Sequence, residues 1–254
     1  YDVSMDESFN LGADDYDIEE VFSGNSQYVV PDYQREYSWK VDQWQELWDD
    51  IHSLIEHRDH HFLGSIVIIP RTGDIKTKEL VDGQQRLSTL MVILAAIRDR
   101  LDGEDGYDHV GEVVEDMLFF RAKSDGETYQ RLQLNDYHSS DFENIMKSNF
   151  GILEDSQIKA CYDYYSEIFS KLPESKVETI RNEIIHSIKI IEIECGSELS
   201  AYRLFQSLND KGLDLSEVDL IKNRLFAYAN DTSDVDAEEV KDLWNGIMGV
   251  IRPE

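Results

Sequence analysis

Five residues stand between an apolar run and a long apolar helix, where their types and spacing could bind an anion. They are Asp82, Gly83, Gln84, Gln85 and Arg86, within "ELVDGQQRLSTLMVILAAI". The first N–H groups of a helix have no partner inside the helix and carry the positive end of its dipole. Gly83 permits a tight turn and the close approach of a ligand, and Arg86 offers a planar fork that fits phosphate oxygens. This junction therefore favours the binding of phosphate groups.

Neighbouring side chains extend this candidate site. Gln84 and Gln85 can each donate and accept hydrogen bonds, which suits a base edge, a ribose or a water molecule. Ser88 and Thr89 add hydroxyls in the first turn of the helix, and Asp82 could hold a divalent cation such as Mg²⁺ or orient water. The simpler alternative is a turn with a helix cap, in which the arginine pairs with one of the 53 acidic residues. The site is not a Walker loop, because the pattern GxxxxGK[ST] occurs nowhere in the chain.

A second motif, "VVPDYQREYSWKVDQW", places an arginine among aromatic residues. Gln34 and Arg35 fall on a loop between an expected strand and an expected helix. In one interpretation the rings seal the core and Arg35 stacks on one of them, which contributes about 0.5–1 kcal/mol at an exposed position. In the other, Arg35 is a second phosphate ligand and the rings form a pocket for a base. The aromatic residues of that pocket would be Tyr33, Tyr37 and Trp39.

The spacing of apolar residues predicts the elements that position these motifs. An amphipathic pattern indicates a helix within 14–24, with Asp14 or Asp15 as its cap. A strand at 27–30 ends at Pro31. The other elements expected in the first hundred residues are a helix from Val41 to about His57, a strand at 61–70, its antiparallel partner at 77–82, and a helix from about Gln85 to Leu101. We therefore expect a small unit of helices and strands whose strand ends meet at one place.

Mainly helical patterns follow the glycine- and acid-rich stretch "LDGEDGYDHVGE", which is the best candidate for a domain boundary. Helical patterns lie at about 109–120, 138–148, 156–170, 174–187, 199–209, 216–230 and 236–250. Two strand-like runs, "TYQRLQL" and "SIKIIEIEC", interrupt them. The expectation is an α+β fold, with a small mixed-sheet domain at 1–103 and a mainly helical region at 104–254 that contains a returning strand near 188–195.

The composition is that of a soluble globular protein with an unusually acidic surface. The 254 residues carry a formal net charge of −29, spread along the whole chain, and no run is long and apolar enough to span a membrane. Such a charge favours a salt-adapted source, and it repels nucleic acid except at a local basic patch. The two separated cysteines predict reduced thiols and a cytoplasmic location. A chain that begins without Met is consistent with part of a longer protein.

Three motifs, in their order and separations, resemble the N-terminal domain family of GmrSD-type restriction proteins. They are "VPDYQREYSW", "FLGSIVI" and "LVDGQQRLSTL", and the later "YRLFQSLNDKGLDLSEVDLIKNRLF" resembles that family's asparagine-glycine block. The resemblance covers about residues 16–230 and implies a ParB/sulfiredoxin-like nucleotide-binding fold for the first domain. It also implies a nucleoside triphosphatase that acts in prokaryotic defence against phage or foreign DNA with modified bases or backbone.

The resemblance, taken with the chemistry of the side chains described above, assigns roles to particular residues. Asp82, Gln85 and Arg86 would be catalytic, with a nucleoside triphosphate as substrate and Mg²⁺ as a possible cofactor that Asp82 could hold. The nucleotide- and phosphate-binding residues would be Gln34, Arg35, Gly83, Gln84, Ser88, Thr89, Asn209, Lys222 and Asn223. Expected partners are modified DNA, in part through regions outside this chain, and an HNH-type nuclease domain downstream or on another chain. A homo-oligomer is possible and no membrane partner is expected.

Two other functions remain open at this stage. In the first, the same turn holds a DNA phosphate or a modified group without catalysis, and the chain is a sensor of modified DNA. In the second, the chain is itself a nuclease, but the net charge of −29 and the lack of a closely spaced His, Asn and His set argue against it. The leading hypothesis is a nucleotide-hydrolysing regulatory domain of a DNA-modification-dependent restriction system.

Overall fold

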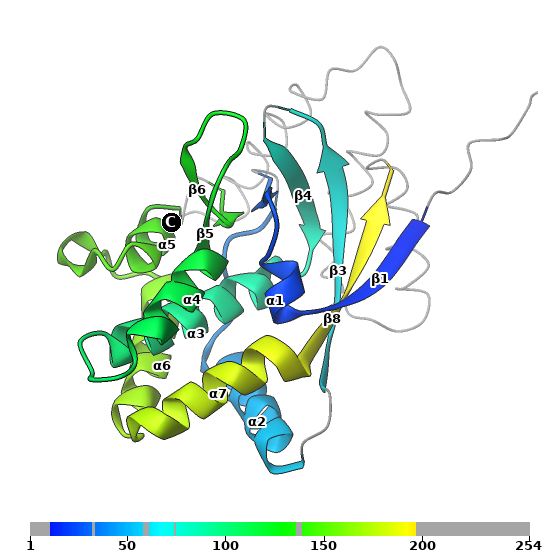
Figure 1. Ribbon diagram of the computed structural model, residues 1–254. Helices are drawn as coiled ribbons and strands as arrows, with labels where there is room; N and C mark the ends of the chain where they lie inside the picture. Colours follow the sequence, from blue (N-terminus) through cyan, green and yellow to red (C-terminus); the bar gives the residue numbers. More distant parts are fainter. Residues whose placement is uncertain (1–10, 32–33, 58–60, 74, 136–138, 197–254) are drawn as a thin grey trace, which may run out of the picture. The chain divides into compact units, whose positions relative to one another are not determined.

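The computed structural model describes residues 11–31, 34–57, 61–73, 75–135 and 139–196 (Figure 1). Within these ranges, six strands form one mixed sheet in the order β1-β8-β3-β4-β2-β7, and two short strands, β5 and β6, form a separate ribbon. In Figure 1 the labelled helices lie to one side of strands β3, β4 and β8. The α+β class predicted from the sequence is confirmed.

The elements alternate along the chain. The strands are β1 (Leu11–Asp17), β2 (Ser26–Val29), β3 (His61–Arg71), β4 (Lys76–Asp82), β5 (Phe119–Arg121), β6 (Thr128–Gln130), β7 (Leu132–Gln133) and β8 (Ile188–Cys195). The helices are α1 (Ile18–Val21), α2 (Val41–His57), α3 (Gln84–Leu101), α4 (Asp108–Leu118), α5 (Ser139–Met146), α6 (Gln157–Ser170) and α7 (Glu174–Ser187), and η1 (Phe150–Ile152) is a single 3₁₀ turn.

Strand β4 lies at the centre of the sheet and leads directly into helix α3. It pairs antiparallel with β3 and parallel with β2. The pairing with β2 stops at Val29 opposite Glu79, so the last residues of β4 run on beyond the end of that neighbour. On the other side the register shifts between Val67 and Ile68, which face Asp82 and Leu80 respectively. The irregular end of β4 therefore leaves backbone groups available next to the start of α3.

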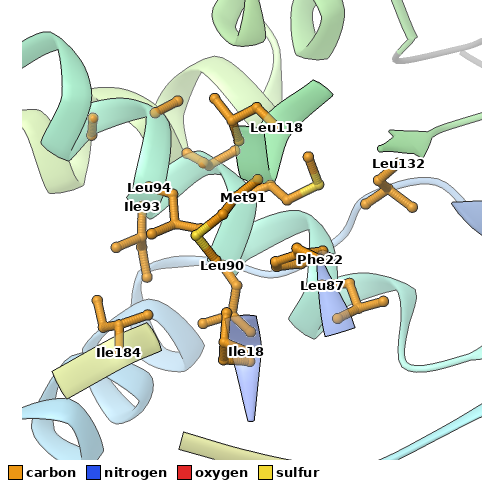
Figure 2. Close-up of a cluster of buried hydrophobic side chains, with 14 of the residues drawn as sticks. Ile18, Phe22, Leu87, Leu90, Met91, Ile93, Leu94, Leu118, Leu132 and Ile184 are labelled. Carbon is orange, nitrogen blue, oxygen red and sulfur yellow. The ribbon is translucent and has the colours of Figure 1, made fainter. Parts of the chain in front are cut away.

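Helix α3 forms the middle of the hydrophobic core. Its residues from Leu87 to Ile97 are all buried, because α3 packs against the four helices α4, α5, α6 and α7. Figure 2 shows part of this core, in which residues of α3 meet α1, α4, β7 and α7. The labelled side chains are Ile18, Phe22, Leu87, Leu90, Met91, Ile93, Leu94, Leu118, Leu132 and Ile184. A helix that is apolar on every side is a buried helix, as the run "LSTLMVILAAI" indicates.

Helix α2 shows the opposite pattern, with one buried face. Trp44, Leu47, Trp48 and Ile51 are buried, at the spacing of three and four residues that the sequence showed. The helix spans Val41–His57, as predicted.

The stretch near residues 14–24 differs from its predicted helix. Residues up to Asp17 form strand β1 at the edge of the sheet, and the helix that follows has only four residues. Asp17, rather than Asp14 or Asp15, caps it: the Asp17 side chain accepts from the Glu20 N–H, and the Glu20 carboxylate accepts from the Asp17 N–H. This reciprocal capping box fixes where the helix begins. The pairing of the preceding residues with the sheet is a long-range effect that local spacing does not reveal.

The predicted strand "TYQRLQL" divides at Arg131, which is 3% exposed. Residues before it pair with β5, and residues after it pair with β2. The Arg131 guanidinium donates to backbone carbonyls of Ser23, Gly24, Ser26, Asp116 and Phe119. Burial lowers its pKa to about 10, so it is still charged at neutral pH. Arg131 thus joins the ends of α1 and α4. It lies between β6 and β7, where a single strand was predicted.

Contacts divide the chain into two compact units, Ala13–Ile193 and Tyr1–Gly12 with Glu194–Glu254. Of the second unit the structure describes only the ends of β1 and β8, and the helices expected at 199–209, 216–230 and 236–250 lie outside the described residues. The boundary expected near residue 103 stays a prediction. Both cysteines, Cys161 and Cys195, are free and buried. No helix within the described ranges is long and apolar enough to cross a membrane.

Candidate functional site

The loop that carries Arg35 lies across the N-terminus of α3, and two buried glutamines hold it there. Gln84 donates from Nε2 to the Arg35 carbonyl at 2.9 Å. Gln85 donates from Nε2 to the Glu36 carbonyl at 3.0 Å. The Gln85 Oε1 accepts from the backbone N–H of Ser38 at 2.8 Å and from that of Trp39 at 3.3 Å. Their amides therefore join the two motifs that the sequence placed in one site.

Three further hydrogen bonds join the same loop to other parts of the chain. Gln34 donates to the Val81 carbonyl at 2.7 Å, at the irregular end of β4. The Gln34 carbonyl in turn accepts from Asn135 at 2.8 Å. Gln157, in the first turn of α6, donates to the Trp39 carbonyl at 2.9 Å. Because strand, helix start and helical region all hold this loop, its backbone is positioned before any ligand binds.

Tyr37 anchors the loop to the core. Its side chain is 7% exposed, and its hydroxyl lies 2.6 Å from Thr89 Oγ1, accepts from Trp44 Nε1 at 2.9 Å and donates to Cys161 Sγ at 3.3 Å. Burial and the neighbouring thiol raise the pKa of this phenol well above its usual value. Burial also raises the pKa of the Cys161 thiol to about 12, so the thiol stays protonated. In this structure Tyr37 belongs to a buried polar network that joins α2, α3 and α6.

The hydroxyls at the start of α3 are buried too. Thr89 donates to the Gln85 carbonyl at 2.7 Å, and both Ser88 and Thr89 are almost completely buried. Of the expected aromatic pocket, Trp39 is half-buried and packs on the core, and Tyr33 lies outside the described residues.

Gly83 is the N-cap of α3, and no other residue fits there. It has φ of +90°, and a Cβ at this position would lie 2.4 Å from Ile66 Cγ2. Having no side chain, Gly83 makes no capping hydrogen bond, so the first N–H groups of the helix are left without the usual side-chain acceptor. The first helical bond runs from the Leu87 N–H to the Gly83 carbonyl at 3.1 Å. Within the described ranges the helix therefore starts without a side-chain cap, at the positive end of its dipole.

Arg86 is half-buried and lies against strand β3. Its Nη1 donates to the Ser65 carbonyl at 2.8 Å. Arg35 is exposed, and in the described part of the chain its guanidinium makes neither a hydrogen bond nor an ion pair. Arg86 likewise has no carboxylate partner among the described residues. Asp82, the last residue of β4, is half-buried and has an interaction partner.

The structure therefore brings the loop that carries Gln34 and Arg35 next to Gly83, Gln84, Gln85 and Arg86 at the start of α3. It does not describe Asn209, Lys222 or Asn223. Gly64, Asn135 and Gln157 contact the site and were not predicted from the sequence. Of these, only Gly64 carried a signal, because a glycine inside a strand indicates a close approach of another group.

Together, these features define a helix N-terminus with two arginines at the end of a mixed sheet. The chain matches the family described as GmrSD restriction endonuclease, N-terminal domain, over residues 18–226, and it belongs to that family. The match covers both motifs of the site and places the chain in a family of restriction systems that defend against phage. No curated protein matches the chain.

Proposed function

We propose that this chain binds and hydrolyses a nucleoside triphosphate. It would act as the regulatory or sensor domain of a restriction system that responds to modified DNA. The observation that carries the proposal is the pair of arginines at the start of α3. In a chain with 53 acidic residues, Arg35 and Arg86 form no ion pair within the described ranges, and the hydrogen bond that Arg86 makes there is to the Ser65 carbonyl. Arginines left with unused donors beside uncapped helix N–H groups suit a polyphosphate.

The proposed chemistry is transfer of the terminal phosphoryl group to water. Arg35 and Arg86 neutralise phosphate oxygens, and the backbone N–H groups of residues 84–86 hold them. Asp82, at the end of β4, orients the attacking water. The side chain of Gln85 is committed to the Arg35 loop, so we assign it the positioning of that loop in addition to the catalytic role expected from the sequence.

A divalent cation that accompanies the nucleotide fits this arrangement, since Mg²⁺ needs only one or two protein carboxylates when phosphates supply further oxygens. Asp82 is the residue that would hold the ion, which would supply neutralisation of phosphate charge. No group of three or more His, Cys, Asp or Glu side chains suited to a metal is found within the described residues.

The remaining parts of the proposal concern partners and location. Modified DNA and an HNH-type nuclease domain are the partners that membership of a restriction endonuclease family supports. Because the chain has a net charge of −29, it repels DNA, which must therefore contact a local basic patch or a region outside this chain. We retain the expectations of a cytoplasmic, salt-adapted protein that can form homo-oligomers.

The test is phosphate release from each of the four ribonucleoside triphosphates, with and without modified DNA, from low to molar salt. Arg86→Ala should abolish hydrolysis in a protein that stays folded, as judged by circular dichroism. The matched control is Arg71→Ala, which removes an exposed arginine of β3 that pairs with Glu79. Normal turnover in Arg86→Ala would remove the proposal.

The same experiment distinguishes hydrolysis from the alternative function, a non-catalytic sensor of modified DNA. It predicts no phosphate release, together with binding to modified duplex that Arg86→Ala weakens. Because Tyr37 is buried, such a sensor would have to rely on Trp39 and residues outside the described ranges for contacts to bases.

A further inference from the structure

Gly64 lies inside strand β3 with φ of +124°, a backbone conformation that residues with a side chain rarely adopt. Further along the same strand, residues 66–69 are buried in the core. Glycine within a strand weakens it, so its presence calls for a local reason such as the approach of another group.

The approaching group is the Arg86 guanidinium. A Cβ at Gly64 would lie 3.2 Å from Arg86 Cζ, 3.3 Å from Nη1 and 3.4 Å from Nε. Three atoms of the planar group are thus at nearly the same distance from one point, so the plane lies face-on against the glycine. The next residue along the strand, Ser65, accepts a hydrogen bond from Arg86 Nη1 at 2.8 Å. Two adjacent residues of β3 therefore form a seat for the guanidinium.

We infer that Gly64 is a positioning residue for Arg86: its missing side chain leaves the surface on which the guanidinium rests. The inference rests on the proposed function, in which Arg86 binds phosphate. Seated in this way, Arg86 uses one donor on Ser65, while Nε and Nη2 form no hydrogen bond to any residue that the structure describes. A guanidinium fixed on one face keeps those donors in a constant direction, which lowers the entropy lost when a triphosphate binds.

A methyl group at position 64 would displace the arginine rather than the core. The contacts of the added carbon would be with the end of a flexible side chain, at distances below ordinary van der Waals contact. The guanidinium would have to shift, and its hydrogen bond to Ser65 would lengthen or break. Gly64→Ala should therefore weaken triphosphate binding in the same way as loss of the arginine.

The first experiment measures affinity for each ribonucleoside triphosphate in four proteins: the natural chain, Gly64→Ala, Arg86→Ala and the double variant. Gly64→Ala should weaken binding by about tenfold or more, the effect of one charge-assisted hydrogen bond. The double variant should bind no more weakly than Arg86→Ala, because the glycine acts only through the arginine. Losses that multiply in the double variant would overturn the inference.

The control for backbone strain is Gly106→Ala. Gly106 has φ of +89°, and a Cβ there would meet nothing within 4 Å. Binding should be unchanged in this variant, and an equal loss would show that a strained backbone alone explains the result. If Gly64→Ala does not fold, the double variant should fold, because it lacks the guanidinium that the added methyl group would clash with. If neither variant folds, the glycine is needed for its backbone conformation alone, and the inference is overturned.

The second experiment needs no nucleotide. The Nε–H resonance of Arg86, assigned by its disappearance in Arg86→Ala, should shift in Gly64→Ala and stay in place in Gly106→Ala. An unmoved resonance in Gly64→Ala would overturn the inference even if triphosphate binds. If the natural chain binds no triphosphate, the proposed function fails, and this resonance still decides whether Gly64 positions Arg86.

Discussion

The two ends of helix α3 use arginine in opposite ways. At the C-terminal end Arg98 is 5% exposed, and its guanidinium bonds Asp99, Glu115 and the carbonyls of Ile145 and Met146. Arg100 bonds Glu104, Glu174 and the carbonyls of Phe169 and Leu172. At the N-terminal end Arg86 has one carbonyl partner among the described residues. Among the described residues, the arginines at the C-terminal end have several acceptors each, whereas Arg86 at the N-terminal end has donors that make no hydrogen bond.

Neutral amides make this difference possible. The N-terminal end must hold the loop at residues 34–39, and it does so with Gln34, Gln84 and Gln85. A carboxylate could accept the same N–H groups as Gln85 Oε1, but it would also pair with a nearby arginine and occupy its donors. Glutamine fixes the backbone without adding negative charge. The two glutamines at the junction between strand and helix therefore hold the loop and leave the donors of Arg86 available.

The comparison predicts that loss of an arginine at the C-terminal end has the largest effect on folding. Arg98→Ala removes the four hydrogen bonds of a buried guanidinium, including its ion pairs with Asp99 and Glu115, and should lower the free energy of unfolding by about 3–5 kcal/mol. Arg86→Ala removes one hydrogen bond at a half-buried position and should cost no more than about 1.5 kcal/mol. Urea unfolding of both variants measures the difference. Equal losses in the two variants would break the contrast between the ends.

The next largest effect concerns the glycine that starts α3. Gly83→Ala should destabilise the protein by about 2–4 kcal/mol, because it combines a positive φ with a clash against Ile66. Gly106→Ala is the matched control, since its φ is nearly the same and its surroundings are open. That variant should cost only about 1–2 kcal/mol, the backbone part alone. A difference near zero in urea unfolding would mean that the helix start can move away from Ile66.

A smaller loss is expected from Gln85→Met, which keeps the length of the side chain and removes three hydrogen bonds to the Arg35 loop. The free energy of unfolding should fall by about 1–3 kcal/mol, and the affinity for triphosphate should fall because the loop that carries Arg35 is held less firmly. Gln84→Met, which removes one hydrogen bond, is the graded comparison and should show smaller changes in both measurements. Loss of stability with unchanged affinity would separate the loop from the proposed site.

The elements around the site could be predicted from the sequence to a large extent. Apolar spacing placed α2, the hairpin of β3 and β4, and α3 correctly, because their local patterns agree with the tertiary structure. The pairing of β1 and the division of a strand at Arg131 could not be predicted, since both depend on partners far along the chain. A spacing pattern contains no such information.

The site itself was predicted only as a set of residues. The sequence identified the DGQQR and QR motifs, but it could not show that the glutamine side chains bind the loop rather than face outward. It could not show that Tyr37 is buried, because a tyrosine among aromatic residues fits a pocket and a core equally well. The roles of Asp82, Gln85 and Arg86 in hydrolysis stay predictions that the Arg86→Ala experiment tests.

The smallest predicted effect is a response to acid at the C-terminal end. The hydrogen bond from Arg100 lowers the pKa of Glu174 below its ordinary value of 4.5. A carboxyl group with a lowered pKa stabilises the fold above its unfolded pKa, and that contribution disappears as the pH falls through the folded pKa. Glu174→Gln should therefore be less stable than the natural chain at pH 6, and the difference should shrink as the pH falls below 4.5 and through the lower pKa of the folded state.

Glu112→Gln is the control for this response, because Glu112 is an exposed glutamate of α4 without an ion pair among the described residues. Its free energy of unfolding, measured with urea, should change with pH in the same way as that of the natural chain. Molar salt should weaken the Glu174 effect, since the pair with Arg100 is partly exposed. A gap between Glu174→Gln and the natural chain that stays constant from pH 6 to pH 3 would show that the pair does not titrate. The C-terminal end of α3 would then owe its stability to hydrogen bonds with carbonyls alone.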